Sequence, residues 1–223
     1  MLRRVALIVL SSAICSYAET DRPAKLYFRH GAVSSAKTLA LLAAAHTYEA
    51  QGKKVIVIKP ELDIRFGKRT VASRAGPSRE ADVLVSATTE LSMDGFEGCD
   101  CILVDEAQFL SARIVEQLRE IATSGVPVIC YGLRTDFRCL SFEGSRRLFE
   151  LADTIEEVKT TCVRCDRKAV FNLKHAGGVP TVAGPQVTLG SEEMYLPVCS
   201  RCYSRSLRLG WTELVPQDAG SGG

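Results

Sequence analysis

Short apolar runs recur along the chain up to about residue 159, and helical patterns lie between them. The segments that predict strands are Lys25–His30, Val55–Ile58, Asp82–Val85, Cys101–Val104, Val126–Tyr131 and Thr154–Val158. Continuous apolar runs are typical of strands buried on both faces, as in a parallel sheet. The segments that predict helices are Thr38–Gln51, Ser111–Thr123 and Arg146–Ala152. This alternation predicts an α/β fold, with a parallel sheet and helices on its faces.

Two further segments are defined by local signals. Ser111 precedes a helical pattern with Ile114 and Leu118 on one face, so we expect it to cap that helix. The polar stretch Lys59–Ser78 contains two prolines and two glycines, which predicts a loop or lid rather than a strand.

The character of the chain changes at Thr160, where cysteines, short polar strands and Gly-Pro loops replace the alternation. We therefore expect a core domain over residues 23–159 and a small second domain over 160–212. Residues 1–22 form a leader, and the Gly/Ser-containing tail 213–223 is expected to be disordered.

The composition is that of an ordinary globular protein. The 223 residues are 46% hydrophobic and 24% charged, which excludes a mostly disordered chain, a coiled coil, a collagen and a polytopic membrane protein. Lys and Arg number 28 against 26 Asp and Glu, a formal net charge of +2. No strong basic excess indicates a nucleic-acid partner, and we expect neither nucleic acid nor membrane as a partner.

The leader resembles a secretory signal in pattern. Arg3 and Arg4 precede the apolar run Val5–Ile14, and small residues follow at Ser16 and Ala18. The run is shorter than the roughly 20 residues that a membrane span needs. Alternatively, the true start lies downstream near Pro23 and the leader is an extension. Free metal-binding thiols and a nucleotide site suit the cytoplasm, and we expect that location.

A phosphate-binding loop is predicted between the first strand and the first helix. The pattern G-x-x-x-x-G-K-[ST] fits, with alanine at the second glycine position. Its residues are Gly31, Ala32, Val33, Ser34, Ser35, Ala36, Lys37 and Thr38. Backbone N–H groups would hold phosphates, Lys37 would reach the β- and γ-phosphates, and Thr38 would bind Mg²⁺. The alternative is a strand–helix turn that binds nothing. If position 36 requires a positive φ, alanine there costs about 1–2 kcal/mol.

An acidic pair follows a buried strand. Asp105 and Glu106 come directly after Cys101–Val104, at the sheet edge where open α/β folds bind ligands. Asp105 would hold Mg²⁺, and Glu106 would accept a proton from an attacking hydroxyl. The alternative is two solvated carboxylates at a strand end.

Two Cys-x-x-Cys pairs predict a metal site. Cys162 and Cys165 form one pair, and Cys199 and Cys202 form the other. Four thiolates at this spacing can hold one tetrahedral structural Zn²⁺. Redox pairs or two disulfides are the alternative. The other five of the nine cysteines have no such spacing.

These motifs in this order resemble the type II thymidine kinase family, which has a RecA-like phosphate-loop core and a zinc-held lasso. The similarity spans roughly Lys25 to Trp211. The stretches that carry it are KLYFRHGAVSSAKT, KPELDIR, VASRAG, DEAQFL, GLRTDF, TCVRC, the segment from Gly190 to Tyr195, and CSRC.

The resemblance implies an enzyme that transfers phosphate from ATP to the 5′-hydroxyl of thymidine, giving dTMP. Glu106 would be the general base. Asp63, Arg65, Asp105 and Gln108 would serve ATP and Mg²⁺ together with the phosphate loop. The residues implied for the thymidine pocket and its lasso are Phe109, Leu133, Phe137, Val187, Thr188, Leu189, Gly190 and Tyr195. A homotetramer is implied by the family as well.

The chain departs from the family pattern at two loop positions, with Val33 in place of methionine and Ala36 in place of glycine. Three rival hypotheses therefore stand beside the kinase. They are an impaired nucleotide- or nucleoside-binding homologue, a zinc-containing ATPase acting on nucleic acid, and a zinc-stabilised structural subunit.

Overall fold

The computed structural model describes residues 23–187 and 195–208. The predicted leader, the predicted tail and three predicted lasso residues, Thr188, Leu189 and Gly190, lie outside the described residues.

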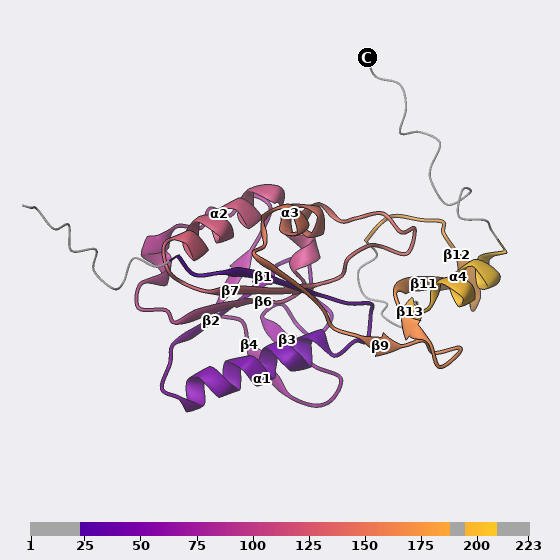
Figure 1. Ribbon diagram of the computed structural model, residues 1–223, viewed down its shortest axis with the longest axis horizontal. Helices are drawn as coiled ribbons and strands as arrows, with labels where there is room; N and C mark the ends of the chain where they lie inside the picture. The colour runs from indigo at the N-terminus through magenta and orange to yellow at the C-terminus, as the bar shows by residue number, and fades with distance from the viewer. Residues whose placement is uncertain (1–22, 188–194, 209–223) are drawn as a thin grey trace, which may run out of the picture.

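A six-stranded sheet forms the centre of the protein (Figure 1). Its strands are β1 (Leu26–His30), β2 (Val55–Pro60), β5 (Val83–Val85), β6 (Cys101–Val104), β7 (Val128–Gly132) and β8 (Thr154–Glu157). They lie in the order β5-β2-β6-β7-β1-β8, and every neighbouring pair is parallel. The predicted α/β class is therefore confirmed.

Helices cover both faces of this sheet (Figure 1). They are α1 (Lys37–Ala50) on one face, and α2 (Ala112–Thr123) and α3 (Glu143–Leu151) on the other. Because successive strand residues point to opposite faces, each central strand contributes to two cores. In β6, Leu103 packs with the α1 layer, whereas Ile102 and Val104 pack with the α2 and α3 layer.

The predicted strands and helices of the core are present, with their ends displaced by a few residues. Ser111 caps α2 as expected, since its Oγ accepts from the Ile114 N–H at 3.4 Å. Short 3-10 helices at Met93–Phe96 and Ala107–Phe109 were not predicted.

The segment 59–78 is not the plain loop that the sequence predicted. Lys59 and Pro60 belong to β2, and the strands β3 (Thr70–Ala72) and β4 (Ser78–Glu80) pair as an antiparallel hairpin. The hairpin forms because Val71 is buried in the α1-side core, and Gly76 supplies a positive φ of 112° near its turn. The lid is thus anchored to the sheet.

The C-terminal part consists of small antiparallel sheets and one helix, at one end of the central sheet (Figure 1). Its elements are β9 (Thr160–Thr161), β10 (Lys168–Ala169), β11 (Phe171–Ala176), β12 (Val179–Thr181), β13 (Tyr195–Val198) and α4 (Ser200–Leu207). Leu173, Val198 and Tyr203 form the centre of a separate core, and Ala32 of the phosphate loop packs into it. The two parts of the chain are therefore in direct contact at the phosphate loop.

Within the described ranges, no helix is both long and apolar enough to cross a membrane.

Candidate active site and metal centre

A cleft of about 300 Å³ opens at the carboxyl ends of the central strands. The loop after β1, the acidic pair after β6 and the lid all contribute to it. Its lining residues are Val33, Ser34, Ser35, Ala36, Lys37, Thr38, Leu39, Asp63, Arg65, Phe66, Ala72, Ser73, Arg74, Ala75, Asp105, Glu106 and Leu133. The structure thus brings most of the residues predicted for ATP and Mg²⁺ into one cavity, where parallel α/β sheets bind their ligands.

Two backbone positions fix the shape of the phosphate loop. A side chain at Gly31 would place its Cβ 2.4 Å from the Val158 carbonyl oxygen, so only glycine fits there. Ala36 has φ 62° and ψ 25°, in the left-handed region. The second glycine position of the motif therefore does require a positive φ, and alanine at this point costs about 1–2 kcal/mol. The loop nevertheless keeps the geometry that leads into α1.

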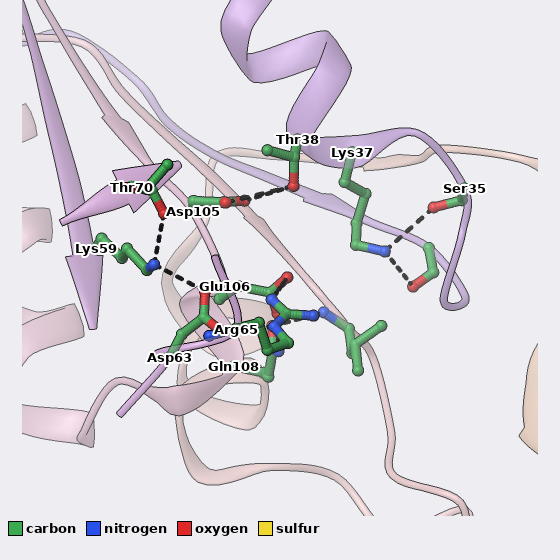
Figure 2. Close-up of polar contacts among 12 residues, drawn as sticks. Ser35, Lys37, Thr38, Lys59, Asp63, Arg65, Thr70, Asp105, Glu106 and Gln108 are labelled. Atoms are coloured by element: carbon green, nitrogen blue, oxygen red, sulfur yellow. Dashed lines mark hydrogen bonds and ion pairs between the residues drawn. The ribbon is translucent and has the colours of Figure 1, made fainter. Parts of the chain in front are cut away.

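The side chain of Lys37 is hydrogen-bonded to residues of the phosphate loop itself. Its Nζ donates to Ser35 Oγ at 3.2 Å (Figure 2), to the Ala32 carbonyl at 2.8 Å and to the Gly31 carbonyl at 3.3 Å. Burial lowers the pKa of Lys37 to about 8, although the nearby carboxylates of Glu106 and Asp105 act in the opposite direction. A phosphate group could replace these three acceptors as the partner of the ammonium.

Thr38 and Asp105 meet across the cleft. Thr38 Oγ1 lies 3.2 Å and 3.3 Å from the two carboxylate oxygens of Asp105 (Figure 2). Burial raises the pKa of Asp105, and the adjacent Glu106 carboxylate raises it further. A divalent cation would relieve both effects. The hydroxyl and the carboxylate are oxygen ligands of the kind that Mg²⁺ prefers, so this pair fits the predicted magnesium site.

Glu106 is held from two sides. Arg65 Nη2 lies 2.5 Å from Glu106 Oε1, and Gln108 Nε2 donates to Glu106 Oε2 at 2.5 Å (Figure 2). Gln108 is buried, and its Oε1 accepts from the Leu133 N–H at 2.9 Å. The amide of Gln108 therefore orients the carboxylate of Glu106 relative to the β7 edge. Gln108 does not line the cleft itself.

A buried lysine anchors the lid and was not assigned from the sequence. Lys59 has no exposed surface, and its Nζ lies 3.3 Å from Asp63 Oδ2. It also donates to the Thr70 carbonyl at 2.6 Å and the Gly67 carbonyl at 3.1 Å. Asp63 in turn receives Arg65 Nε at 2.6 Å. The stretch KPELDIR indicated Asp63 and Arg65, whereas Lys59 has no sequence signal beyond its place at the end of an apolar strand.

The residues predicted for the thymidine pocket do not all line the cleft. Leu133 lines it, whereas Phe109 packs edge to face on Phe142 at 5.8 Å between ring centroids. Phe137 is buried, with the Tyr195 ring 6.1 Å away and Lys174 Nζ 4.5 Å from its ring centroid. Val187, the last described residue before the gap, is half-buried.

The four predicted metal ligands come together. The sulfurs of Cys162, Cys165, Cys199 and Cys202 all lie within 4.8 Å of one another. Cys165 Sγ is 3.6 Å from Cys199 Sγ and 3.7 Å from Cys202 Sγ. A disulfide requires about 2.05 Å, whereas sulfurs bound to one tetrahedral Zn²⁺ at about 2.3 Å are roughly 3.8 Å apart. The cluster fits a metal ion, and all four cysteines are free thiols.

Asn172 is a second residue that the sequence analysis missed. Its Oδ1 accepts from the Val33 N–H at 2.8 Å, and its Nδ2 donates to the Thr135 carbonyl at 2.9 Å. A lone asparagine within a short strand has no spacing that would have indicated this position.

A phosphate loop and an Asp-Glu pair at the carboxyl edge of a parallel sheet define a P-loop NTPase-type protein. The family model described as "Thymidine kinase" matches residues 24–203. The chain therefore belongs to the thymidine kinase family, and the resemblance seen in the sequence is confirmed.

Curated relatives agree with this assignment. The chain is 44% identical over 183 residues to the thymidine kinase of Lactiplantibacillus plantarum, covering 81% of this chain and 95% of that protein. It is 42% identical over 194 residues to that of Lactobacillus acidophilus, covering 81% and 96%. Among solved structures, the Pif1 helicase from Candida albicans is similar with a TM-score of 0.37 at 12% identity, over 61% of this chain and 36% of that one.

Proposed function

We propose that this protein transfers the γ-phosphoryl group of ATP to the 5′-hydroxyl of thymidine, with Mg²⁺, to give dTMP. Family membership supports thymidine phosphorylation in general. The finer reaction rests on one observation, which is that the phosphate loop, the Thr38–Asp105 pair and Glu106 share one cleft.

The phosphate loop and Lys37 would bind the ATP phosphates. The N-terminus of α1 and the loop amides favour negative charge at this point. Lys37 would exchange the Ala32 carbonyl, 2.8 Å from its Nζ, for phosphate oxygens. Thr38 and Asp105 would hold Mg²⁺, which neutralises the phosphate charge when bound. Positioning and charge neutralisation supply most of the acceleration in such reactions.

Glu106 would accept the proton of the 5′-hydroxyl. Gln108 fixes one carboxylate oxygen and Arg65 contacts the other, so the hydroxyl must take the place of Arg65. The Arg65 side chain is 27% exposed and lies on the lid, which allows it to turn toward the phosphates. This exchange would leave Glu106 free as a base only when both substrates are present.

The nucleoside would lie beside Leu133. We assign Phe109, Phe137 and Tyr195 to the walls of its pocket and the segment 187–190 to the lasso, as the family resemblance implies. Phe137 and Tyr195 contact each other, which supports a common wall. The four-cysteine cluster would hold one structural Zn²⁺ at the base of this region.

The cytoplasm is the location that we propose, because thiolates that hold a metal must remain reduced. A homotetramer is proposed from the family resemblance alone.

The direct test is phosphate transfer from ATP by a protein starting near Ala24, with and without thymidine and Mg²⁺. We expect transfer that requires both and falls by about 10²–10⁴ in Glu106→Gln, which keeps the shape of the side chain but removes the base. Equal rates in Glu106→Gln would show that Glu106 is not the base.

A binding protein with impaired catalysis is the second candidate, and the left-handed conformation of Ala36 is the observation that favours it. Transfer that appears only in Ala36→Gly would establish this alternative. Absence of transfer in both proteins would contradict the kinase proposal.

A further inference from the structure

The peptide unit between Ala32 and Val33 is held at both ends. Lys37 Nζ donates to the Ala32 carbonyl at 2.8 Å, and the Val33 N–H donates to Asn172 Oδ1 at 2.8 Å. The C=O and N–H of a trans peptide lie in one plane and point in opposite directions. Fixing one therefore fixes the other. Asn172 sets the direction of the carbonyl on which Lys37 rests.

The same side chain reaches a second segment. Asn172 Nδ2 donates to the Thr135 carbonyl at 2.9 Å, and the residue is only 4% exposed. With its oxygen on an N–H and its NH₂ on a carbonyl, the amide has one favourable orientation, because a flip would oppose like groups. Thr135 lies in the segment Gly132–Phe137, which follows β7. One amide thus connects the phosphate loop to the segment proposed to line the nucleoside pocket.

Asn172 belongs to a sheet of the C-terminal part, where it pairs with Pro197 of β13. It lies in β11, which pairs with β12 on one side and with β13 on the other. Ala32 packs into the same core cluster as Leu173. The phosphate loop is therefore shaped by a part of the protein that contributes no lining to the cleft among the described residues.

We propose that Asn172 is a positioning residue that keeps the phosphate loop aligned with the nucleoside-pocket segment. It acts through the Ala32–Val33 peptide and the Thr135 carbonyl, and it contacts neither reacting group. The effect of Asn172 on catalysis rests on the proposed function. Its effect on the conformation of the phosphate loop does not. Its effect is to align the phosphoryl donor with the acceptor hydroxyl, where small displacements cost much of the rate.

The first test compares Asn172→Ala with a matched control. Gln117→Ala also removes a buried amide that accepts from a backbone N–H, that of Leu91 at 3.1 Å, but it does so on α2, outside the cleft. We expect Asn172→Ala to lower kcat/KM for ATP by about tenfold or more, because two buried backbone groups lose their partner. Gln117→Ala should stay within about twofold despite a similar loss of thermal stability. Equal losses of kcat/KM in the two variants would overturn the proposal.

The second test follows the Val33 amide directly, by hydrogen exchange in the nuclear magnetic resonance spectrum. We expect slow exchange in the parent and exchange faster by about tenfold or more in Asn172→Ala. Asn172→Asp keeps an oxygen for Val33 but sets an acceptor against the Thr135 carbonyl. It should therefore keep the protection of Val33 while losing kcat/KM for thymidine.

These two tests separate the two proposals. A parent protein without phosphate transfer would contradict the proposed function, while Val33 exchange would still report on Asn172. Unchanged Val33 exchange in Asn172→Ala, with a fully active parent, would contradict the role of Asn172 alone.

Discussion

Ala36 carries a conformational cost that a single substitution can remove. Ala36→Gly should raise the free energy of unfolding by up to about 1 kcal/mol, since relief of the left-handed strain exceeds the added chain entropy of glycine. Ala43→Gly is the matched control. Ala43 is an exposed position inside α1, so the same change there should destabilise by about 0.5–1 kcal/mol. Urea unfolding measures the free energy of unfolding of both variants. A change of the same sign in the two variants would contradict the strain at Ala36.

The lowered pKa of Lys37 predicts that ATP binding depends on pH. Its pKa is lowered to about 8 by burial. Only the protonated form pairs with phosphate, so the titration of Lys37 should leave ATP affinity unchanged up to about pH 8. Above pH 8, ATP affinity should fall by up to about tenfold per pH unit. If Lys37 had an ordinary lysine pKa, ATP affinity would not change below about pH 10.

Titration of ATP affinity between pH 6.5 and 9.5 checks this prediction, with thymidine affinity as the control. A flat profile for ATP over this range would show that Lys37 keeps an ordinary pKa in the free protein.

At the scale of single elements, the lid depends on the buried lysine at the end of β2. Lys59→Met should destabilise the protein by about 1–3 kcal/mol, because the Thr70 and Gly67 carbonyls lose their donor and Asp63 loses one charge partner. The KM for ATP should rise as well, since Asp63 and Arg65 line the cleft.

Lys68→Met provides the comparison for this prediction. Lys68 pairs with Glu61 at 3.6 Å, and both side chains are largely exposed, so its loss should cost less than about 1 kcal/mol. Urea unfolding that gives equal losses for both lysines would refute the anchoring role of Lys59.

The elements that the sequence predicted well are those with long, regular patterns. The buried apolar runs of β2, β6 and β7 and the periodic face of α2 are patterns of this kind. The hairpin of β3 and β4 was missed because its strands have three residues each and are joined by a segment that contains Gly76 and Pro77. Helix α4 was missed because it is short and polar, with Tyr203 as its single fully buried side chain.

The residues of the site also divide into those that a local sequence motif indicates and those that no motif indicates. The phosphate loop, the acidic pair and the cysteine pairs are local motifs, so their residues could be named from spacing. Asn172 has no local motif, and Lys59 begins the stretch KPELDIR but was given no role from it. The hydrogen bonds of Asn172 reach residues 139 and 37 positions away in the sequence, which only the fold reveals.

At the scale of the whole molecule, we expect a metal ion bound by the cysteine cluster to hold together the C-terminal part. We expect about one Zn per chain by metal analysis, and loss of that metal in Cys199→Ser. Because zinc binding of this kind is coupled to folding, the melting midpoint should fall by more than about 4 °C, which corresponds to about 1–2 kcal/mol at this chain length.

The control for this prediction is Cys139→Ser. Cys139 is a free thiol outside the cluster, and its replacement should leave the metal content unchanged. Full metal content and unchanged stability in Cys199→Ser would refute the four-thiolate site.

The place of β1 in the sheet has a consequence for synthesis of the protein on the ribosome. The strands β2, β5 and β6 lie within residues 55–104 of the chain, and β2 pairs with both of the others, so they can pair early. Among the described strands, β1 pairs with β7 and β8, and its Leu26 and Phe28 are fully buried. Leu26 and its partner Asp153 are 127 residues apart. At 5–20 residues per second, β1 waits on the order of 6–25 s for its neighbours. We expect the phosphate loop, which follows β1, to be among the last parts of the core to reach its final shape.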